Sequence, residues 1–175
     1  MSVQPKRARP QRMWRTGAAL AVFAFLAMSA ASSAAAGLFT GMEGSWRGEG
    51  SLKWSTGENE RMRCTAKYEV EGDGNTLVQN LTCATDSTRL VVKSAITYKP
   101  NAGVITGSWS ETGYGINGWV TGTAGIGSIE ANVQSTDKDF NAKVSVVTRG
   151  GEQIVKIIPT NLEVTEVFVT MQRGS

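Results

Sequence analysis

The amino-acid sequence predicts an all-β protein, specifically an antiparallel up-and-down β-barrel of about 8–10 strands, with a β-sandwich as the alternative. Beyond residue 36, apolar and polar residues alternate with period two, and no stretch keeps a helical apolar pattern over three turns. Clusters of turn-forming residues recur about every eight to twelve residues. Connections this short join antiparallel neighbours, and a sheet this wide protects its edges by closing or by folding over.

The turn signals divide the chain into about ten predicted strands. Glycine, proline, asparagine, aspartate and serine favour turns because they supply an unusual φ, a fixed φ or local hydrogen bonds. The first strand begins at Gly44 and the last ends at Arg173. Nine clusters separate the strands, at 55–59, 72–75, 85–87, 100–103, 112–115, 124–127, 135–138, 149–151 and 159–161.

Apolar residues at every second position predict which side chains face the interior. Their charged neighbours, such as Arg61, Lys67 and Glu69, are predicted to face solvent. The segment 153–158 (QIVKII) alternates poorly, so either face of it is a candidate; we place Ile154 and Ile158 inside. The other predicted inward residues are Met62, Cys64, Ala66, Tyr68, Val70, Leu77, Leu81, Cys83, Leu90, Val92, Ile96, Tyr98, Ile105, Trp109, Ile116, Val120, Ile129, Ala131, Val133, Phe140, Val144, Val146, Val167, Val169 and Met171.

Residues 1–36 have the pattern of a cleavable secretory signal peptide. Five of the 18 basic residues lie in the first fifteen positions, and an apolar run from Ala18 to Met28 follows. That run is well short of the ~20 residues that a membrane span needs, and small residues with an A-x-A site follow it. We expect cleavage after Ala36 and a single mature domain, 37–175. Met13 begins a shorter leader, so Met1 and Met13 are both candidate start sites.

The charge balance reverses once the leader is removed. The whole chain has a formal net charge of +3, but the mature part keeps 13 basic against 15 acidic residues. Scattered basic residues on a weakly acidic domain argue against nucleic-acid binding. No cysteine lies near the cleavage site to take a lipid, and no arginine pair marks twin-arginine export. We expect a periplasmic or extracellular protein with a Sec-type signal and no stable membrane span.

Cys64 and Cys83 are the only cysteines, so only one disulfide pairing is possible. In an exported protein such a pair indicates a structural cross-link, and the C-x-x-C spacing of redox pairs is absent. A hairpin turn centred on Asp73 and Gly74 places Cys64 opposite Cys83. A two-residue type I′ turn and a four-residue loop over 72–75 give the same pairing with opposite hydrogen-bond parity, and both remain open. The cross-link should stabilise the fold by roughly 3 kcal/mol.

The composition removes most routes to catalysis. The chain has no histidine, and therefore lacks the commonest general base, the imidazole metal ligand and the usual haem ligand. Oxidised cysteines also exclude a thiolate metal site. Glu49, Glu58, Glu60 and Glu111 are the candidates for a carboxylate-dependent hydrolase, but nothing in the sequence pairs any two of them. We expect no catalytic residue, no metal and no cofactor.

The two ends of the predicted domain resemble the calycin superfamily, which includes the lipocalins. Gly44 and Trp46 open the first strand as G-x-W, and Arg173 ends the last strand. In that superfamily the tryptophan lies across the closed end of the barrel and the arginine packs on its ring face, so the resemblance implies structural closure by Trp46 and Arg173. The opening Gly44-x-Trp46-x-Gly48-x-Gly50 also resembles the haem-binding nitrobindins, whose histidine ligand this chain lacks.

A second resemblance covers nearly the whole mature chain and concerns small exported proteins of rhizobia and related alphaproteobacteria. It implies export and the cross-link, and it implies no mechanism. The motifs that carry it are Arg61-x-Arg63-Cys64…Tyr68-x-Val70…Leu77-x-Gln79…Leu81-x-Cys83-Ala84-x-Asp86-Ser87, then Gly107-x-Trp109-x-Glu111, then Thr148-Arg149-Gly150…Gln153.

Seven glycines lie from Gly107 to Gly127, with Trp109 and Trp119 among them. Strand glycines mark close backbone approaches or sharp bends. One interpretation is that these glycines permit barrel curvature while the tryptophans pack over the gaps. The other is that Trp109, Tyr114 and Trp119 form an aromatic platform at an open rim, suited to an apolar ligand or a sugar ring.

Two functions of different classes follow from this pattern. The first is an exported barrel that holds a small apolar ligand or lipid without catalysis, which the many small inward residues favour. The second is a ligandless envelope or secreted interaction protein whose own side chains fill the barrel. A carboxylate-dependent hydrolase is a remote third. The sequence does not predict the oligomeric state.

Overall fold

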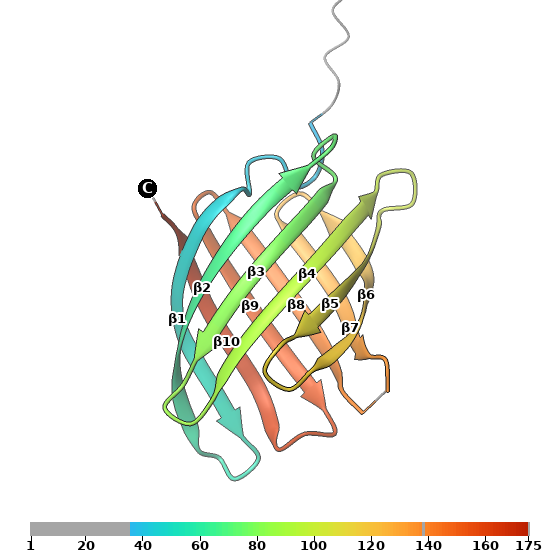
Figure 1. Ribbon diagram of the computed structural model, residues 1–175. Helices are drawn as coiled ribbons and strands as arrows, with labels where there is room; N and C mark the ends of the chain where they lie inside the picture. The colour runs from blue at the N-terminus through green and yellow to red at the C-terminus, as the bar shows by residue number, and fades with distance from the viewer. Residues whose placement is uncertain (1–35, 138, 175) are drawn as a thin grey trace, which may run out of the picture. The chain divides into compact units, whose positions relative to one another are not determined.

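The computed structural model describes residues 36–137 and 139–174, which form a closed antiparallel barrel of ten strands (Figure 1). Each strand pairs with its neighbours in the chain, and β1 pairs with β10 to close the wall. The up-and-down barrel is therefore confirmed, and the sandwich alternative is wrong. The strands are β1 (Gly44–Trp54), β2 (Asn59–Glu71), β3 (Thr76–Ala84), β4 (Arg89–Lys99), β5 (Val104–Glu111), β6 (Ile116–Gly125), β7 (Ser128–Ser135), β8 (Asn141–Arg149), β9 (Glu152–Thr160) and β10 (Val164–Arg173).

The predicted leader lies outside the described residues except for Ala36. Within the described part of the chain, no helix is long and apolar enough to cross a membrane. The segment 37–43 precedes β1 and lies at the end of the barrel where the hairpin loops 72–75, 100–103, 126–127 and 150–151 also lie. We call this the capped end; it is the upper end in Figure 1.

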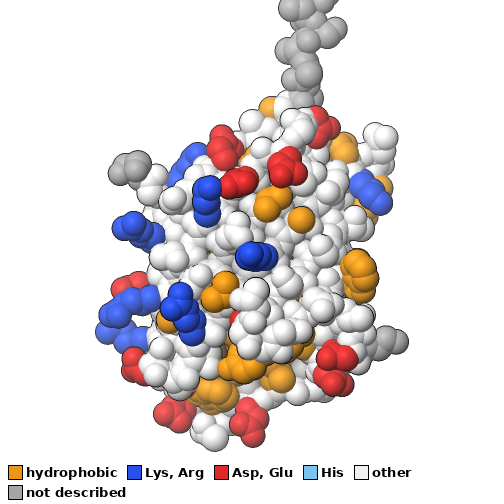
Figure 2. Space-filling model, in the orientation of Figure 1, with side chains coloured by type: hydrophobic (Ala, Val, Ile, Leu, Met, Phe, Trp, Pro, Cys, Tyr) orange, Lys and Arg blue, Asp and Glu red, His pale blue; other side chains and the backbone are white. Residues whose placement is uncertain are grey.

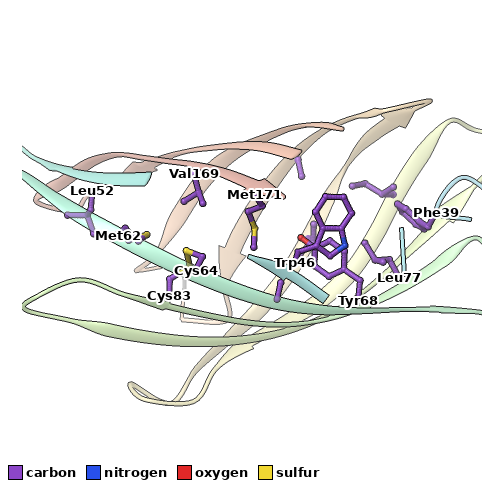
Figure 3. Close-up of a cluster of buried hydrophobic side chains, with 14 residues drawn as sticks. Phe39, Trp46, Leu52, Met62, Cys64, Tyr68, Leu77, Cys83, Val169 and Met171 are labelled. Atoms are coloured by element: carbon purple, nitrogen blue, oxygen red, sulfur yellow. A yellow bond between two sulfur atoms is a disulfide. The ribbon is translucent and has the colours of Figure 1, made fainter. Parts of the chain in front are cut away.

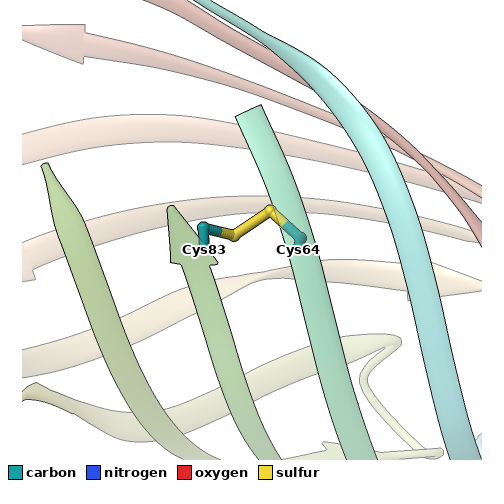
Figure 4. Close-up of a disulfide and its surroundings, with 2 residues drawn as sticks. All are labelled: Cys64 and Cys83. Atoms are coloured by element: carbon teal, nitrogen blue, oxygen red, sulfur yellow. A yellow bond between two sulfur atoms is a disulfide. The ribbon is translucent and has the colours of Figure 1, made fainter. Parts of the chain in front are cut away.

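The predicted cross-link is present and joins β2 to β3 (Figure 4). Cys64 lies directly opposite Cys83 in the strand register, as the hairpin argument requires. Their Cα atoms are 4.1 Å apart, a separation typical of a non-hydrogen-bonded antiparallel pair. A disulfide indicates an oxidising compartment outside the cytoplasm.

The β2–β3 hairpin has the four-residue loop 72–75, so the two-residue type I′ turn is wrong. Positive φ occurs at Gly72 (63°) and Gly74 (85°), not at Asp73. The Asp73 carboxylate instead accepts the backbone N–H of Asn75 at 3.1 Å. A side chain that bonds the backbone two residues ahead stabilises this longer loop, and the longer loop sets the parity of the cysteine pair.

The densest packing lies inside the β1, β2, β3 and β10 part of the wall (Figure 3). Trp46, Met62 and Met171 are each almost fully buried there, and Phe39 from the segment 37–43 joins them from the capped end. The Trp46 and Tyr68 rings lie 5.7 Å apart. Burial of large apolar side chains in this part of the barrel supplies much of the hydrophobic stabilisation.

Strand β9 presents the opposite face from the one predicted. Gln153, Val155 and Ile157 are opposite the inward residues of β10, and the expected Ile154 and Ile158 therefore point outward. Gln153 is only 2% exposed, because its amide is hydrogen-bonded inside the barrel. Hydrophobicity alone favoured Ile154 and Ile158 as the inward residues of β9. The inward face instead contains the Gln153 amide, which is hydrogen-bonded to Tyr68 and Thr148.

Inward glycines bring neighbouring strands unusually close together. A Cβ added to Gly118 would lie 1.8 Å from the backbone oxygen of Gln134 on β7, and one added to Gly107 would lie 2.2 Å from that of Ala95 on β4. Similar approaches occur at Gly48, Gly50 and Gly122. These contacts support the interpretation that the glycines permit barrel curvature.

Candidate functional site

The interior of the barrel is packed on one side and accessible on the other. No inward side chain of β4 is fully buried, although the wall around it is closed. The same holds for Val144 and Val146 on β8, and for Val155 and Ile157 on β9. Because the closed wall separates these side chains from the outer solvent, their exposed area borders space within the barrel. We call this partly accessible side of the interior the lumen.

A cavity of about 240 Å³ lies at the capped end. Leu38, Phe39 and Met42 of the segment 37–43 form one side of it. Strands β7 and β8 form the other side with Ile129, Val146 and Thr148, and the β6–β7 turn completes the rim. Apolar side chains with few polar groups are typical of small-ligand sites.

A buried polar chain leads to this cavity from the packed side. The Tyr68 hydroxyl donates to Gln153 Oε1 at 2.7 Å, and Gln153 Nε2 donates to Thr148 Oγ1 at 3.2 Å. Burial raises the pKa of Tyr68 well above its usual range, although the hydrogen bond to Gln153 acts in the opposite direction. Tyr68 therefore stays neutral, and the chain ends at the Thr148 hydroxyl in the cavity wall.

The segment 37–43 is held in place by backbone and side-chain hydrogen bonds. Phe39 donates its N–H to Gly74 O at 2.9 Å, and Leu38 donates to Asn75 Oδ1 at 3.0 Å. Arg173 binds the other end of the segment. Its Nη1 donates to Gly41 O at 2.8 Å, and its Nη2 donates to Glu43 O at 2.5 Å. The segment thus forms a lid over part of the capped end.

Trp46 and Arg173, which the calycin resemblance assigned to closure, are directly paired across β1 and β10. Trp46 Nε1 donates to Met42 O at 3.0 Å, so both residues contact the segment 37–43. The ring contact of Trp46 is with Tyr68, and the Arg173 guanidinium donates hydrogen bonds to carbonyl groups of the lid.

The structure does not bring Trp109, Tyr114 and Trp119 together on one surface. Trp109 points inward, its ring centroid is 5.5 Å from that of Phe140, and its Nε1 donates to Gln134 O at 3.3 Å. Trp119 follows Gly118, the register partner of Trp109, and therefore points outward. Tyr114 lies exposed in the β5–β6 turn. The postulated platform is thus divided between the inside, the outside and one end of the barrel.

The four candidate carboxylates do not form a catalytic pair. Glu111 is buried and accepts backbone N–H groups from Val91 at 2.9 Å and Tyr114 at 2.6 Å. Burial alone raises its pKa, but these bonds and one from Gly113 outweigh that effect and leave the pKa below the usual value. Glu60 accepts the Trp54 indole N–H at 2.9 Å. Its pKa is lowered, mainly by hydrogen bonds from the side chains of Thr85 and Ser87.

The two remaining carboxylates lie on the outer surface. Glu49 forms exposed ion pairs with Arg61 at 3.7 Å and Arg63 at 3.5 Å. Glu58 lies exposed in the β1–β2 turn. Across the described residues, no group of three or more histidine, cysteine, aspartate or glutamate side chains is placed to hold a metal ion.

Sequence reasoning missed Gln153, Thr148 and the segment that contains Leu38 and Phe39. Gln153 interrupts an apolar strand, and its partner Tyr68 lies 85 residues away, so no local pattern reveals the bond. The signal that was available for the lid is the apolar pair Leu38-Phe39, which follows Gly37, the first residue after the expected cleavage site.

Comparison with known proteins adds no further assignment, because no protein-family model and no curated protein matches the chain significantly. The firm description is a closed ten-stranded antiparallel barrel, compatible with a calycin-like fold, with one disulfide.

Proposed function

We propose that this barrel binds a small, uncharged, apolar ligand or lipid in its lumen and carries out no catalysis. The observation that carries the proposal is the accessibility of the inward apolar side chains of β4, β8 and β9 inside a closed wall. Exposed apolar surface within a barrel gains free energy when an apolar ligand covers it, by roughly 25 cal/mol per Å².

The polar groups around the cavity narrow the class of ligand. Three hydroxyl side chains, Thr40, Ser128 and Thr148, line the cavity, and the Thr148 hydroxyl already accepts a bond from Gln153. Its own O–H is therefore available to donate to a ligand oxygen. No charged side chain lines this cavity. An apolar molecule with one neutral oxygen, such as an alcohol, ester or ketone, fits this lining better than a carboxylate.

The disulfide supports a location outside the cytoplasm, and we propose the periplasm or the extracellular space. Cleavage of the leader after Ala36 leaves Gly37 as the first residue of the mature protein. The lid over the cavity begins at this residue, so export would produce a barrel whose amino terminus lies beside the ligand cavity.

Two neighbouring residues of β8 provide a matched test. Val146 lines the cavity, whereas Val147 points outward. Titration with the uncharged apolar fluorophore Nile red should give saturable binding to the wild type. Val146→Trp should fill the cavity and weaken binding by at least about tenfold, or about 1.4 kcal/mol. Val147→Trp should leave the affinity unchanged. Equal affinities in both variants would place the dye on the outer surface and contradict the proposal.

Organic extraction of protein purified from the periplasm separates the two classes of function. Mass spectrometry of the extract should detect a stoichiometric neutral lipid or other apolar compound, and the intact protein mass should correspond to a chain that begins at Gly37. The dense packing around Trp46 and Met62 favours the ligandless interaction protein instead. An empty extract together with no saturable dye binding would select that alternative.

A further inference from the structure

Trp119 differs from the other tryptophans of the described chain. Trp46, Trp54 and Trp109 each donate their indole N–H to a protein acceptor. Trp119 is 62% exposed on the outer face of β6, and its indole N–H has no acceptor within the described residues. An exposed indole with an unused donor leaves a large apolar ring face and one hydrogen-bond donor available to a ligand.

The residues on both sides of Trp119 are neutral and polar. In the strand register its neighbours are Ser108 on β5 and Gln134 on β7. Directly opposed side chains in an antiparallel sheet have Cβ atoms about 4.5–5.5 Å apart, so both lie beside the indole ring. Neither side chain has a hydrogen-bond partner within residues 36–137 and 139–174, and both are exposed. One amide and one hydroxyl therefore flank the ring with their bonding capacity unused.

The same face continues along β5 and β6 without charge. The remaining outward side chains of β5 and β6 are aliphatic, hydroxyl or amide groups, with no acidic or basic residue among them. The strand sequences place lysine or arginine on the outer faces of β1, β2, β4, β8 and β9 and none on β5, β6 or β7. Figure 2 shows several of these basic side chains on the side of the wall formed by β1 and β2. The outward face of β7 adds the exposed Asn132, and its charged residue, Glu130, lies further from Trp119, opposite Thr123, and accepts a hydrogen bond from Ser145. A charged polymer would be attracted to other parts of this molecule, and a neutral ligand is complementary to this face.

We propose that the outer face of β5, β6 and β7 around Trp119 is a binding site for a neutral saccharide. A pyranose ring with equatorial hydroxyls has an apolar C–H face that stacks on an indole and a polar edge that exchanges hydrogen bonds with amides and hydroxyls. Trp119 supplies the stacking surface, and Gln134 and Ser108 supply the flanking bonds. This site is separate from the lumen and does not depend on the ligand proposed there.

Calorimetric titration with cellohexaose, laminarihexaose and chitohexaose tests the site directly. The wild type should bind at least one of them saturably, with a Kd near or below about 1 mM. Trp119→Ala should weaken this binding by at least about tenfold, and Gln134→Ala by about threefold to tenfold. Trp119→Phe should retain most of the affinity because a ring face remains. Tyr114→Ala, which removes another exposed aromatic ring at the end of the barrel, should have no effect.

The variants are expected to fold because both side chains are exposed, and circular dichroism with urea unfolding verifies this. The proposal is overturned if no probe binds at concentrations up to about 10 mM, or if folded Trp119→Ala binds as tightly as the wild type. It is also overturned if sulfated or uronic-acid polymers bind instead and the Trp119 variants do not weaken them. Because Val146→Trp leaves this face intact, unchanged saccharide binding by that variant distinguishes the site from the lumen.

Discussion

Glu111 shows how one buried carboxylate can be structural in a chain that offers it no catalytic partner. Its two oxygens accept N–H groups from β4 and from the β5–β6 turn, so the side chain ties three backbone segments together. Charge-assisted bonds of this kind are stronger than neutral ones, and leaving such donors unpaired is destabilising. The glutamate that could be considered for hydrolysis is thus fully used in holding one end of the barrel.

Glu111→Gln should therefore destabilise the protein and flatten the acid part of its stability profile. The glutamine side chain has one oxygen and one NH₂ group, so one of the backbone N–H donors that now bonds Glu111 would lose its acceptor. The free energy of unfolding at pH 7 should therefore fall by about 1–3 kcal/mol. In the wild type, the lowered pKa of Glu111 gives stability that is present above the unfolded pKa of about 4.3 and is lost as the pH falls through the folded pKa. Urea unfolding at a series of pH values measures both effects.

The exposed Glu58→Gln provides the control, with little expected change in the unfolding free energy at pH 7. If Glu111→Gln and wild type lost stability equally between neutral pH and pH ~3, Glu111 would have no part in acid unfolding.

Single residues also show which inward positions could be predicted from the sequence and which could not. Period-two alternation placed nearly every inward residue correctly, because a one-residue slip would turn an entire apolar face to solvent. Strand β9 was misplaced because both of its faces carry apolar residues. Ile154 and Ile158 share the outer face with Lys156, and the inner face includes Gln153, whose burial depends on Tyr68 in a distant strand. Alternation also contains enough information to separate Trp109 from Trp119, since the two residues lie on paired strands with opposite parity.

At the scale of elements, the hairpins were predictable and the lid was not. Each strand and turn has a local signal, and Cys64 with Cys83 adds a register check that the structure confirms. The segment 37–43 has no periodic pattern, because it is held by contacts with residues far along the chain, above all Arg173. Its position depends on barrel closure, which brings the last strand beside the first.

Arg173→Ala should release the lid without unfolding the barrel. The substitution removes both guanidinium bonds to the segment, whereas the strand pairing of β1 with β10 is made by backbone groups and remains. Hydrogen exchange at the Phe39 amide, which bonds Gly74 O, should accelerate by at least about tenfold, and amides of β6 should exchange as in the wild type. Arg173→Lys, which keeps the charge but not the two-pronged geometry, should give an intermediate rate. Uniform acceleration across all strands would show that Arg173 stabilises the whole barrel instead.

For the molecule as a whole, the relation between curvature and lumen is the central feature. Large side chains fill the barrel beside β1, β2 and β10, whereas β4, β8 and β9 enclose space. Inward glycines occur on β1, β5 and β6, and each approaches the backbone of the adjacent strand. Because no side chain occupies these points, the wall can bend sharply there. A sharply bent wall can be filled with side chains on one side and leave space on the other.

Two glycines of β6 test this relation with the same substitution. Gly118→Ala would place a methyl group 1.8 Å from the backbone oxygen of Gln134, so the β6–β7 pairing must shift. We expect a loss of about 3 kcal/mol in the free energy of unfolding, at the upper end for overpacked sites. Gly125→Ala meets only the hydroxyl of Ser128 at 3.7 Å, an ordinary contact, and should change stability by less than about 1 kcal/mol, with stabilisation expected because the unfolded chain loses freedom. Thermal and urea unfolding measure both variants. If curvature maintains the lumen, Nile red affinity should also fall in Gly118→Ala. Equal unfolding free energies in the two variants would show that β6 tolerates a flatter wall.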